Sequence, residues 1–390
     1  MSKRSFLLGA SAGFALGYAA LRAWECFTTD RRIRVQRDAA VYGTTRRALT
    51  VASIARTMAG SYAFAFGAGA VERYADRFPV WLRPAAFGTA LMALETLVDL
   101  PGDFLEGHIL EHRYGLSEQS VPSWISDKIK EQLLATGLMA LISTLLGAAL
   151  RRWPRRWPAI ASAGALPLLL IANVVVPIYV MPLFNKYEPL EGPLERRLRA
   201  LASRFGVGDA DILRVDMSRQ TKKANAFVIG IGTTHRIVVG DTLIANFPDE
   251  EVEFVVAHEL GHFVSKDTWR MIALAQATIV AVLIGTSLAM QRSPADAARS
   301  SSVARVQFWA TLFSTALRPA ICAFARSREW AADRFALAAT QAASTGASAF
   351  RRLRDQNLAE DAQPKWYEFF FSTHPSLKAR IETLDRAAPA

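Results

Sequence analysis

The sequence contains seven apolar blocks, each close to the length that an α-helix needs to cross a lipid bilayer. A helix rises about 1.5 Å per residue, so a hydrocarbon core of about 30 Å requires roughly 20 residues. The blocks are residues 5–23, 49–71, 80–100, 132–150, 158–180, 271–290 and 303–322. The sequence therefore predicts a mainly α protein with seven transmembrane helices.

Composition supports a membrane protein with a substantial polar part. Of the 390 residues, 51% are hydrophobic and 21% are charged, too apolar for an ordinary soluble enzyme and too charged for a chain that lies wholly in lipid. The first block follows Lys3 and Arg4 like a signal peptide. No clear cleavage site follows it and further spans do, so we expect an uncleaved first helix.

The net charge of +11 comes mostly from arginines gathered in loops. The run 151–156 combines four arginines with a tryptophan at the end of a span, which is typical of anchoring at the membrane interface. We therefore expect the lipid bilayer, and no nucleic acid, as the partner of the basic residues. Cys26 and Cys322 are too few for a disulfide framework and too far apart for a metal knuckle.

Ionisable residues interrupt several of the predicted spans. Arg56 lies in the second span and Arg83 and Glu95 lie in the third, while Arg305 and Arg318 flank the last one. A charged group within a membrane normally faces the interior of a helix bundle or a wet cavity. These positions predict a polar space inside the bundle.

A polar insertion at residues 185–269 is predicted to form a water-exposed α/β unit. Residues 194–205 read as a helix, 212–215 as a strand, and 226–231 with 236–239 as a hairpin. An edge strand beside a catalytic site can bind a peptide by β-augmentation, so Asn225, Ala226 and Phe227 are candidate substrate contacts. The alternative, a hairpin that serves only as core, is equally compatible with the pattern.

Within this unit, His258, Glu259 and His262 form an HELGH motif on an apolar, helix-compatible stretch. Residues i and i+4 share one helix face, so both imidazoles can reach a single zinc ion. Glu259 then points toward a water on the metal as a general base, which is the signature of a zinc peptidase. A solvated histidine pair or a chance match is the alternative interpretation.

A catalytic zinc needs three protein ligands and one open position, so a third ligand must come from another helix. Glu329 is the best candidate, because it lies on a strongly helical stretch, residues 324–336, and shares a face with Asp333. Asp333 is predicted to accept the N–H of a ligating histidine, His258 in the first instance. The alternative is a charged helix face with arginine partners on neighbouring turns.

These residues, with several other segments in the same order, resemble the integral-membrane zinc metalloproteases of the CAAX prenyl protease 1 family, also called farnesylated-protein converting enzyme 1. The resemblance covers most of the chain and is much more specific than HELGH alone. Its segments are residues 99–101, 111–119, 181–190, 225–227, 236–243, 258–262, 326–333 and 374–377 with Arg380.

The resemblance implies a seven-helix barrel that encloses a water-filled chamber, with an inserted zincin-like α/β catalytic unit. It implies one Zn²⁺ per chain held by His258, His262 and Glu329, with Glu259 as the general base, as in gluzincins. It further implies that Asn225 and Ala226 bind the substrate backbone and that His374 and Arg380 stabilise the oxyanion. From the residues alone, His374 reads as a histidine at a helix start before Pro375.

The predicted function is that of a membrane-bound zinc metalloendopeptidase similar to CAAX prenyl proteases. Its substrate is a peptide or protein, and in CAAX processing that substrate carries a prenyl group at its C-terminus. The alternative function is a quality-control protease or chaperone-like factor acting on misfolded or translocating clients. The compact chain and its Arg/Ala bias fit a prokaryotic homologue in the plasma membrane. The zinc site is expected on the cytoplasmic side, although the 151–156 cluster would then lie outside, against the positive-inside tendency.

The predicted organisation has four segments. Residues 1–184 carry five transmembrane helices, and residues 185–269 form the α/β insertion with the HELGH helix. Residues 270–322 carry two further transmembrane helices, and residues 323–390 form a helical segment that supplies the third zinc ligand. The two intervening spans return this last segment to the side of the insertion.

Overall fold

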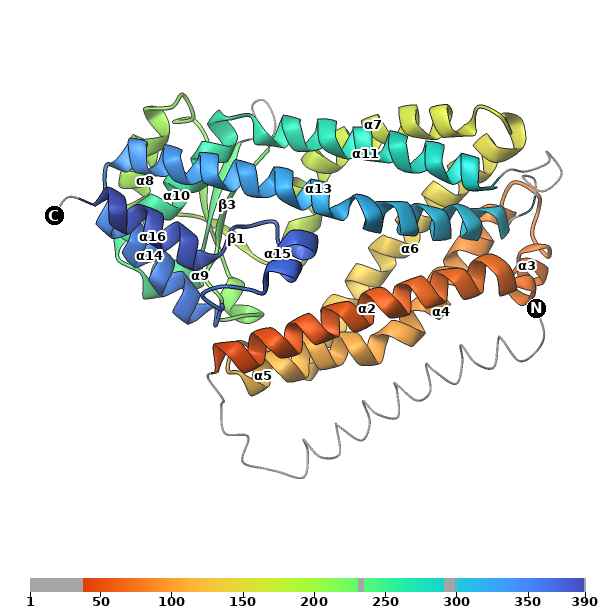
Figure 1. Cartoon of the computed structure of the whole chain (residues 1–390), viewed down its shortest axis with the longest axis horizontal. Coiled ribbons are helices and arrows are strands. Elements are labelled where there is room, and N and C mark those ends of the chain that lie inside the picture. Colours follow the sequence, from red (N-terminus) through yellow and green to blue (C-terminus); the bar gives the residue numbers. More distant parts are fainter. Residues whose placement is uncertain (1–37, 231–234, 291–298, 300, 389–390) are drawn as a thin grey trace.

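The computed structural model describes residues 38–230, 235–290, 299 and 301–388. The first predicted span, residues 5–23, lies outside the described residues. Long helices make up one end of the molecule, and a small sheet with shorter helices makes up the other (Figure 1). The mainly helical fold with an α/β unit agrees with the predicted fold class.

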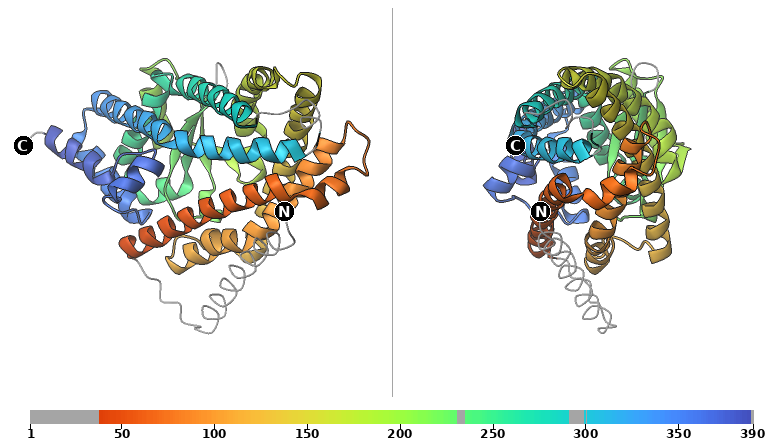
Figure 2. Two further views of the ribbon diagram at one scale, coloured as in Figure 1. Left: turned by 45° about the vertical axis from the view of Figure 1, so that its right-hand side comes forward. Right: turned by 90° about the vertical axis from the view of Figure 1, so that its right-hand side faces the viewer.

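Six long helices form a closed ring. Each packs against the next in the order given below, and the last, α13, packs against the first. Figure 2 shows this arrangement along the longest axis of the molecule. Its members overlap the second to seventh predicted spans. They are α2 (Ala39–Gly67), α4 (Arg83–Phe104), α6 (Val121–Arg152), α7 (Trp157–Val175), α11 (Asp267–Met290) and α13 (Ser301–Thr340).

In the described part of the chain, four segments are long and apolar enough to cross a membrane by length and composition. They are Val121–Arg152, Trp157–Leu183, Asp267–Met290 and Ser301–Thr340. Large apolar side chains on these helices are exposed, including Leu133, Leu138, Ile171 and Leu288. A soluble protein would bury such rows, so this surface suits contact with lipid.

The charged residues in the spans bond to neighbouring helices of the ring. Arg56 of α2 forms an ion pair with Asp99 of α4. Glu95 of α4 accepts a hydrogen bond from the amide of Gln307 on α13 at 2.9 Å. Because an unpaired polar group in lipid costs several kcal/mol, these contacts explain how the spans tolerate charge.

The sheet has four strands in the order β1-β2-β4-β3. β3 (Ala226–Ile229) and β4 (Arg236–Gly240) pair antiparallel, as the predicted hairpin requires, and their turn lies outside the described residues. β2 (Asp211–Val215) pairs parallel with β4. β1 (Tyr187–Pro189), which no sequence pattern predicted, pairs antiparallel with β2. β3 is therefore an edge strand.

Shorter helices cover the sheet around one hydrophobic core. α8 (Pro193–Ser203), predicted as residues 194–205, contributes buried Leu198, and α10 (Asp249–Val264) contributes Phe254 and Leu260. Three acidic residues in the first turn of α10 match the positive end of its dipole. The remaining helices are α3 (Gly69–Ala75), α5 (Glu111–Arg113), α9 (Asp241–Asn246), α14 (Ala343–Gln356), α15 (Lys365–Phe371) and α16 (Leu377–Ala387).

Helix α13 joins the two parts of the molecule. Its 40 residues span about 60 Å, roughly twice the thickness of a hydrocarbon core. It continues without a break through residue 322, where the seventh predicted span ends, and packs against α10. The same helix therefore runs along the wall of the ring and continues into the α/β unit (Figure 1), where it carries Glu329.

We expect Gly346→Ala to lower the stability of the protein. A Cβ at residue 346 of α14 would lie 2.3 Å from the ring of Phe254, which is fully buried, so α10 and α14 would have to separate. Overpacking of this kind costs about 1–3 kcal/mol. The apparent melting temperature in detergent should fall, whereas Gly137→Ala, with nothing within 4 Å, should leave it unchanged or raise it. An unchanged melting temperature for Gly346→Ala would contradict this packing.

Candidate active site

Two helices bring three potential metal ligands together. The Nε2 atom of His258 lies 3.4 Å from Oε2 of Glu329, and the Nε2 atom of His262 lies 3.4 Å from Oε1 of the same carboxylate. One ligand atom from each residue lies within 4.8 Å of the other two. Among the described residues this is the only such group of three.

The donor set fits a zinc ion. Oε2 of Glu329 is buried and accepts no hydrogen bond from the described residues, so it lacks a partner that a cation would supply. The Nε2 atoms of both imidazoles point toward this carboxylate, and their Nδ1 atoms form hydrogen bonds with other residues. Two histidines and one glutamate leave the fourth position of a tetrahedral zinc open.

A carboxylate orients each imidazole. Nδ1 of His258 donates to Asp333 at 2.8 Å, and Nδ1 of His262 donates to Asp267 at 2.9 Å. Such contacts fix the tautomer and ring orientation of metal ligands. The one-turn spacing of Asp333 to Glu329 predicts the first contact, whereas no local pattern predicts the contact of Asp267, because it depends on the turn that follows α10.

That turn brings Asp267 back to the motif. Helix α10 ends at Val264, Lys266 takes a left-handed conformation with φ of 56°, and α11 begins at Asp267. A left-handed conformation is uncommon for a residue with a side chain, and here it lies in the short connection between the two helices. The buried carboxylate of Asp267 also accepts a hydrogen bond from Nε of Arg328 at 2.7 Å.

Gly261, inside the HELGH motif, lets α10 and α13 approach each other. A Cβ there would lie 3.1 Å from the Cα of Ala332 and from the side chain of Phe335. That distance is tighter than ordinary van der Waals contact, so a larger residue would push α13 away. The absence of a side chain at Gly261 thus lets α13 lie close enough to α10 for Glu329 to contact the histidines.

The site favours positive charge on its imidazoles. Burial lowers the pKa of His258, but the hydrogen bond to Asp333 and the nearby carboxylate of Glu329 outweigh burial and raise the pKa to about 9. The field of carboxylates that stabilises a proton here equally favours a metal cation. Burial raises the pKa of Glu259, against the opposing effect of the two histidines, which brings this carboxylate toward the range of a general base.

Arg380 and His374 lie next to this centre. Arg380, buried on α16, donates from Nε and Nη2 to Asp333 at 2.8 and 2.6 Å, and its Nη1 lies 3.8 Å from Oε2 of Glu329. Its guanidinium also stacks 4.2 Å above the ring of Phe350. His374, in the exposed segment before α16, places Nε2 3.3 Å from Oε1 of Glu329.

A cavity of about 700 Å³ opens onto the site. Among the predicted site residues, its wall includes His258, Glu259, Glu329, His374, Arg380, Asn225 and Ala226. Phe227, the next residue of β3, is not among the lining residues in the described structure. The cavity also reaches Tyr42 and Arg46 at the start of α2, which no motif indicated and which only the tertiary packing brings here.

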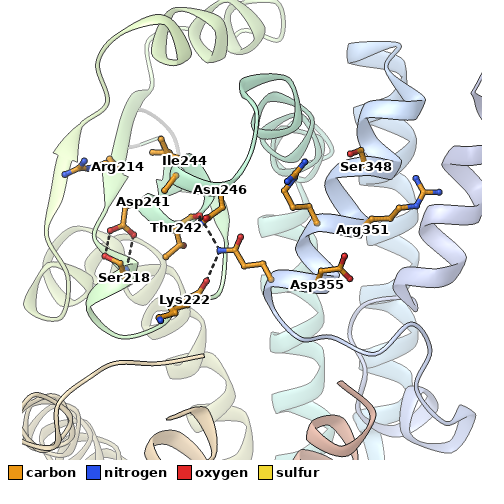
Figure 3. A pocket seen from close by; sticks show the side chains of 13 residues that line it. Arg214, Ser218, Lys222, Asp241, Thr242, Ile244, Asn246, Ser348, Arg351 and Asp355 are labelled. Carbon is orange, nitrogen blue, oxygen red and sulfur yellow. Dashed lines mark hydrogen bonds between the residues drawn. The ribbon is translucent and has the colours of Figure 1, made fainter. Parts of the chain in front are cut away.

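A second cavity, of about 930 Å³, lies between α9 and α14 (Figure 3). Its wall contains none of the predicted site residues. Its arginines are held by carboxylates: Arg214 by Glu188 at 2.9 Å, Arg351 by Asp385 at 2.5 Å and Arg352 by Glu251 at 2.8 Å. These guanidinium groups are therefore neutralised within the protein, and we assign no reaction to this cavity.

Comparison with known proteins fits this geometry. The model of peptidase family M48 matches residues 189–388, and that of the CAAX prenyl protease N-terminal domain, with five membrane helices, matches residues 41–186. The chain belongs to peptidase family M48. It is a zinc metallopeptidase of the CAAX prenyl protease 1 family, as the sequence resemblance indicated.

Individual relatives agree with the family. The "Uncharacterized metalloprotease YhfN" of Bacillus subtilis is 26% identical over 78% of this chain and 74% of its own length. The CAAX prenyl protease 1 of Saccharomyces cerevisiae is 32% identical over 48% of this chain and 42% of its own length. The crystal structure of S. mikatae Ste24p shares the fold, with a TM-score of 0.74, 21% identity, and coverage of 99% of this chain and 100% of that one.

The orienting carboxylates give a testable consequence for this M48 peptidase. We expect Asp267→Asn and Asp333→Asn each to weaken zinc binding by about 10- to 100-fold, because each removes the negative partner of one imidazole. Competition against a chelator of known zinc affinity measures this. Asp385→Asn, which breaks only an exposed pair with Arg351, is the matched control. Unchanged zinc affinity in both variants would contradict the assignment.

Proposed function

We propose that the protein is an endopeptidase in which His258, His262 and Glu329 hold the catalytic zinc and Glu259 is the general base. The observation that carries the proposal is the convergence of these ligands from α10 and α13 at a cavity that Glu259 also lines. When bound, zinc supplies a Lewis acid that polarises the scissile carbonyl and activates water.

Glu259 moves the protons of the reaction. Its carboxylate takes a proton from the attacking water as the new C–O bond forms, and it later delivers that proton to the departing amine. The raised pKa of Glu259 supports this exchange, since a carboxylate with a higher pKa is a stronger base. Its position directly after His258 keeps it at the same end of the cavity as the ligands.

We assign His374 and Arg380 to the stabilisation of the oxyanion. Both line the cavity, and their side chains reach Glu329 from the side of α16. Each donor aimed at developing negative charge is worth a few kcal/mol in the transition state. Asn225, Ala226 and Phe227 are assigned to the peptide backbone, because they lie at the start of an edge strand beside α10.

The substrate class that we propose is a peptide with a prenylated C-terminus. The match of the CAAX prenyl protease N-terminal model to the membrane helices and the similarity to the yeast CAAX prenyl protease 1 support it. The protein is a multi-pass integral membrane protein. We further propose the prokaryotic plasma membrane as its location, with the zinc site on the cytoplasmic side, and the four segments described from the sequence as its domains.

Glu259→Gln tests the general base. The amide cannot take the proton, so turnover should fall by at least about 100-fold while zinc content stays at one per chain. Peptide cleavage is followed by chromatography, and zinc is measured by plasma mass spectrometry on the same preparation. Near-normal turnover by this variant would exclude Glu259 as the base.

Metal removal tests the reaction and the substrate class together. Purified protein in detergent is incubated with a farnesylated CAAX peptide, its unprenylated form and an unfolded protein, with and without phenanthroline. We expect cleavage of the farnesylated peptide, its loss with the chelator, and recovery on adding Zn²⁺. Cleavage of the unfolded protein in preference to the peptide would favour quality control, and inactivity on all three that the chelator does not change would favour a chaperone-like role.

A further inference from the structure

We propose that Arg46 forms a carboxylate-binding subsite of the active-site cavity and fixes the end of the substrate that departs as the amine product. The inference rests on the proposed peptidase function. Arg46 lies near the start of α2, far in sequence from HELGH, yet it lines the same cavity as Glu259 and Glu329. Its chemistry therefore acts on whatever peptide occupies that cavity.

Arg46 is the cation of this region that no carboxylate neutralises directly. Its neighbour Arg47 forms an ion pair with Glu360, and Lys223 forms one with Glu111 at 2.7 Å. Among the described residues, Arg46 has no ion pair. Its guanidinium has one hydrogen bond, to the hydroxyl of Tyr42 at 3.4 Å, and lies 5.7 Å from the centre of that ring.

Arg46 is exposed, and its polar neighbours bond mainly to one another and leave most of its donors free. The hydroxyl of Tyr42 donates to Glu111 at 2.5 Å and accepts from Nζ of Lys223 at 2.9 Å, which ties α2 to the segment before β3. Glu111 and Glu106 act on Arg46 only at longer range. A guanidinium carries five N–H donors, so most remain available to a bound molecule.

The edge strand leads toward this arginine. Lys223, Ala224, Asn225 and Ala226 line the cavity one after another, and β3 begins at Ala226. A peptide that pairs antiparallel with β3, the commoner arrangement, runs opposite to the strand. Its C-terminal part therefore passes Asn225 and ends near Lys223 and Arg46.

The ligand chemistry follows from the guanidinium. Its planar fork matches the two oxygens of a carboxylate, and a charge-assisted pair of this kind is about twice as strong as a neutral hydrogen bond. A peptide can offer such a group as its free C-terminus or as an acidic side chain near that end. The subsite would select substrates cleaved a short distance before a carboxylate.

The test measures binding in the Glu259→Gln background, so that cleavage does not enter the result. The probe is a fluorescein-labelled, farnesylated peptide ending in Cys-Ala-Ala-Ser, made with a free C-terminal acid or with a C-terminal amide. Fluorescence anisotropy in detergent with Zn²⁺ gives both dissociation constants. We expect the acid to bind about 10- to 100-fold more tightly than the amide.

Variants of Arg46 test whether this residue causes the preference for the acid over the amide. Arg46→Gln should reduce the ratio of acid to amide affinity to about one while amide binding, which also reports on folding, is unchanged. Arg46→Lys should retain part of the ratio. Arg214→Gln, whose guanidinium pairs with Glu188 and lines the other cavity, should retain all of it (Figure 3). Equal binding of acid and amide, or a ratio that survives Arg46→Gln, would overturn the subsite.

A second pair of peptides separates the two sources of carboxylate. Both end in an amide, and the last residue is Asp in one and Asn in the other. Tighter binding of the Asp peptide, lost in Arg46→Gln, shows that a side chain also occupies the subsite, whereas equal binding restricts it to the C-terminus. Since binding is read without turnover, inactivity of the wild-type enzyme would count against the peptidase proposal alone.

Discussion

The carboxylate of Glu329 between two imidazoles is the interaction on which the rest of the structure depends. It places negative charge in a buried position, and such charge is tolerated only when cations surround it. The Nδ1 atom of each imidazole donates a hydrogen bond to an aspartate. Each aspartate in turn accepts a hydrogen bond from an arginine, Arg380 or Arg328. The alternating charges connect α10, α11, α13 and α16, so the site also fixes how these helices pack.

Local sequence patterns predicted the parts of this arrangement that depend on one helix. The spacing of His258 and His262, and of Glu329 and Asp333, follows from 3.6 residues per turn. Six predicted spans overlap long helices, and the helices of the last four are apolar enough to cross a membrane, because lipid imposes a length and a composition on a span. Periodicity alone could not predict that α10 packs against α13. The coordination chemistry of zinc predicted this contact, because a catalytic zinc needs a third protein ligand from another helix.

Contacts between distant segments were not readable in the same way. Asp267 contacts His262 across a turn in which Lys266 is left-handed, and a lysine gives no sign in the sequence of that conformation. Strand β1 is too short for an alternating pattern, and the parallel pairing of β2 with β4 depends on the connection between them. Arg46 belongs to no predicted span or motif, and its place in the cavity depends on how the ring of helices meets the α/β unit.

The continuity of α13 has a consequence for how this peptidase is built. The family segment at residues 189–388 contains α11 and α13, both long and apolar enough to enter lipid, so the catalytic machinery is interleaved with the membrane anchor. α11 and the first part of α13 lie between His262 and Glu329 in the chain, so a fragment without these helices would lack the segment that joins the candidate ligands. The candidate zinc ligands are therefore joined through membrane-compatible helices, so the geometry of the site depends on how those helices pack.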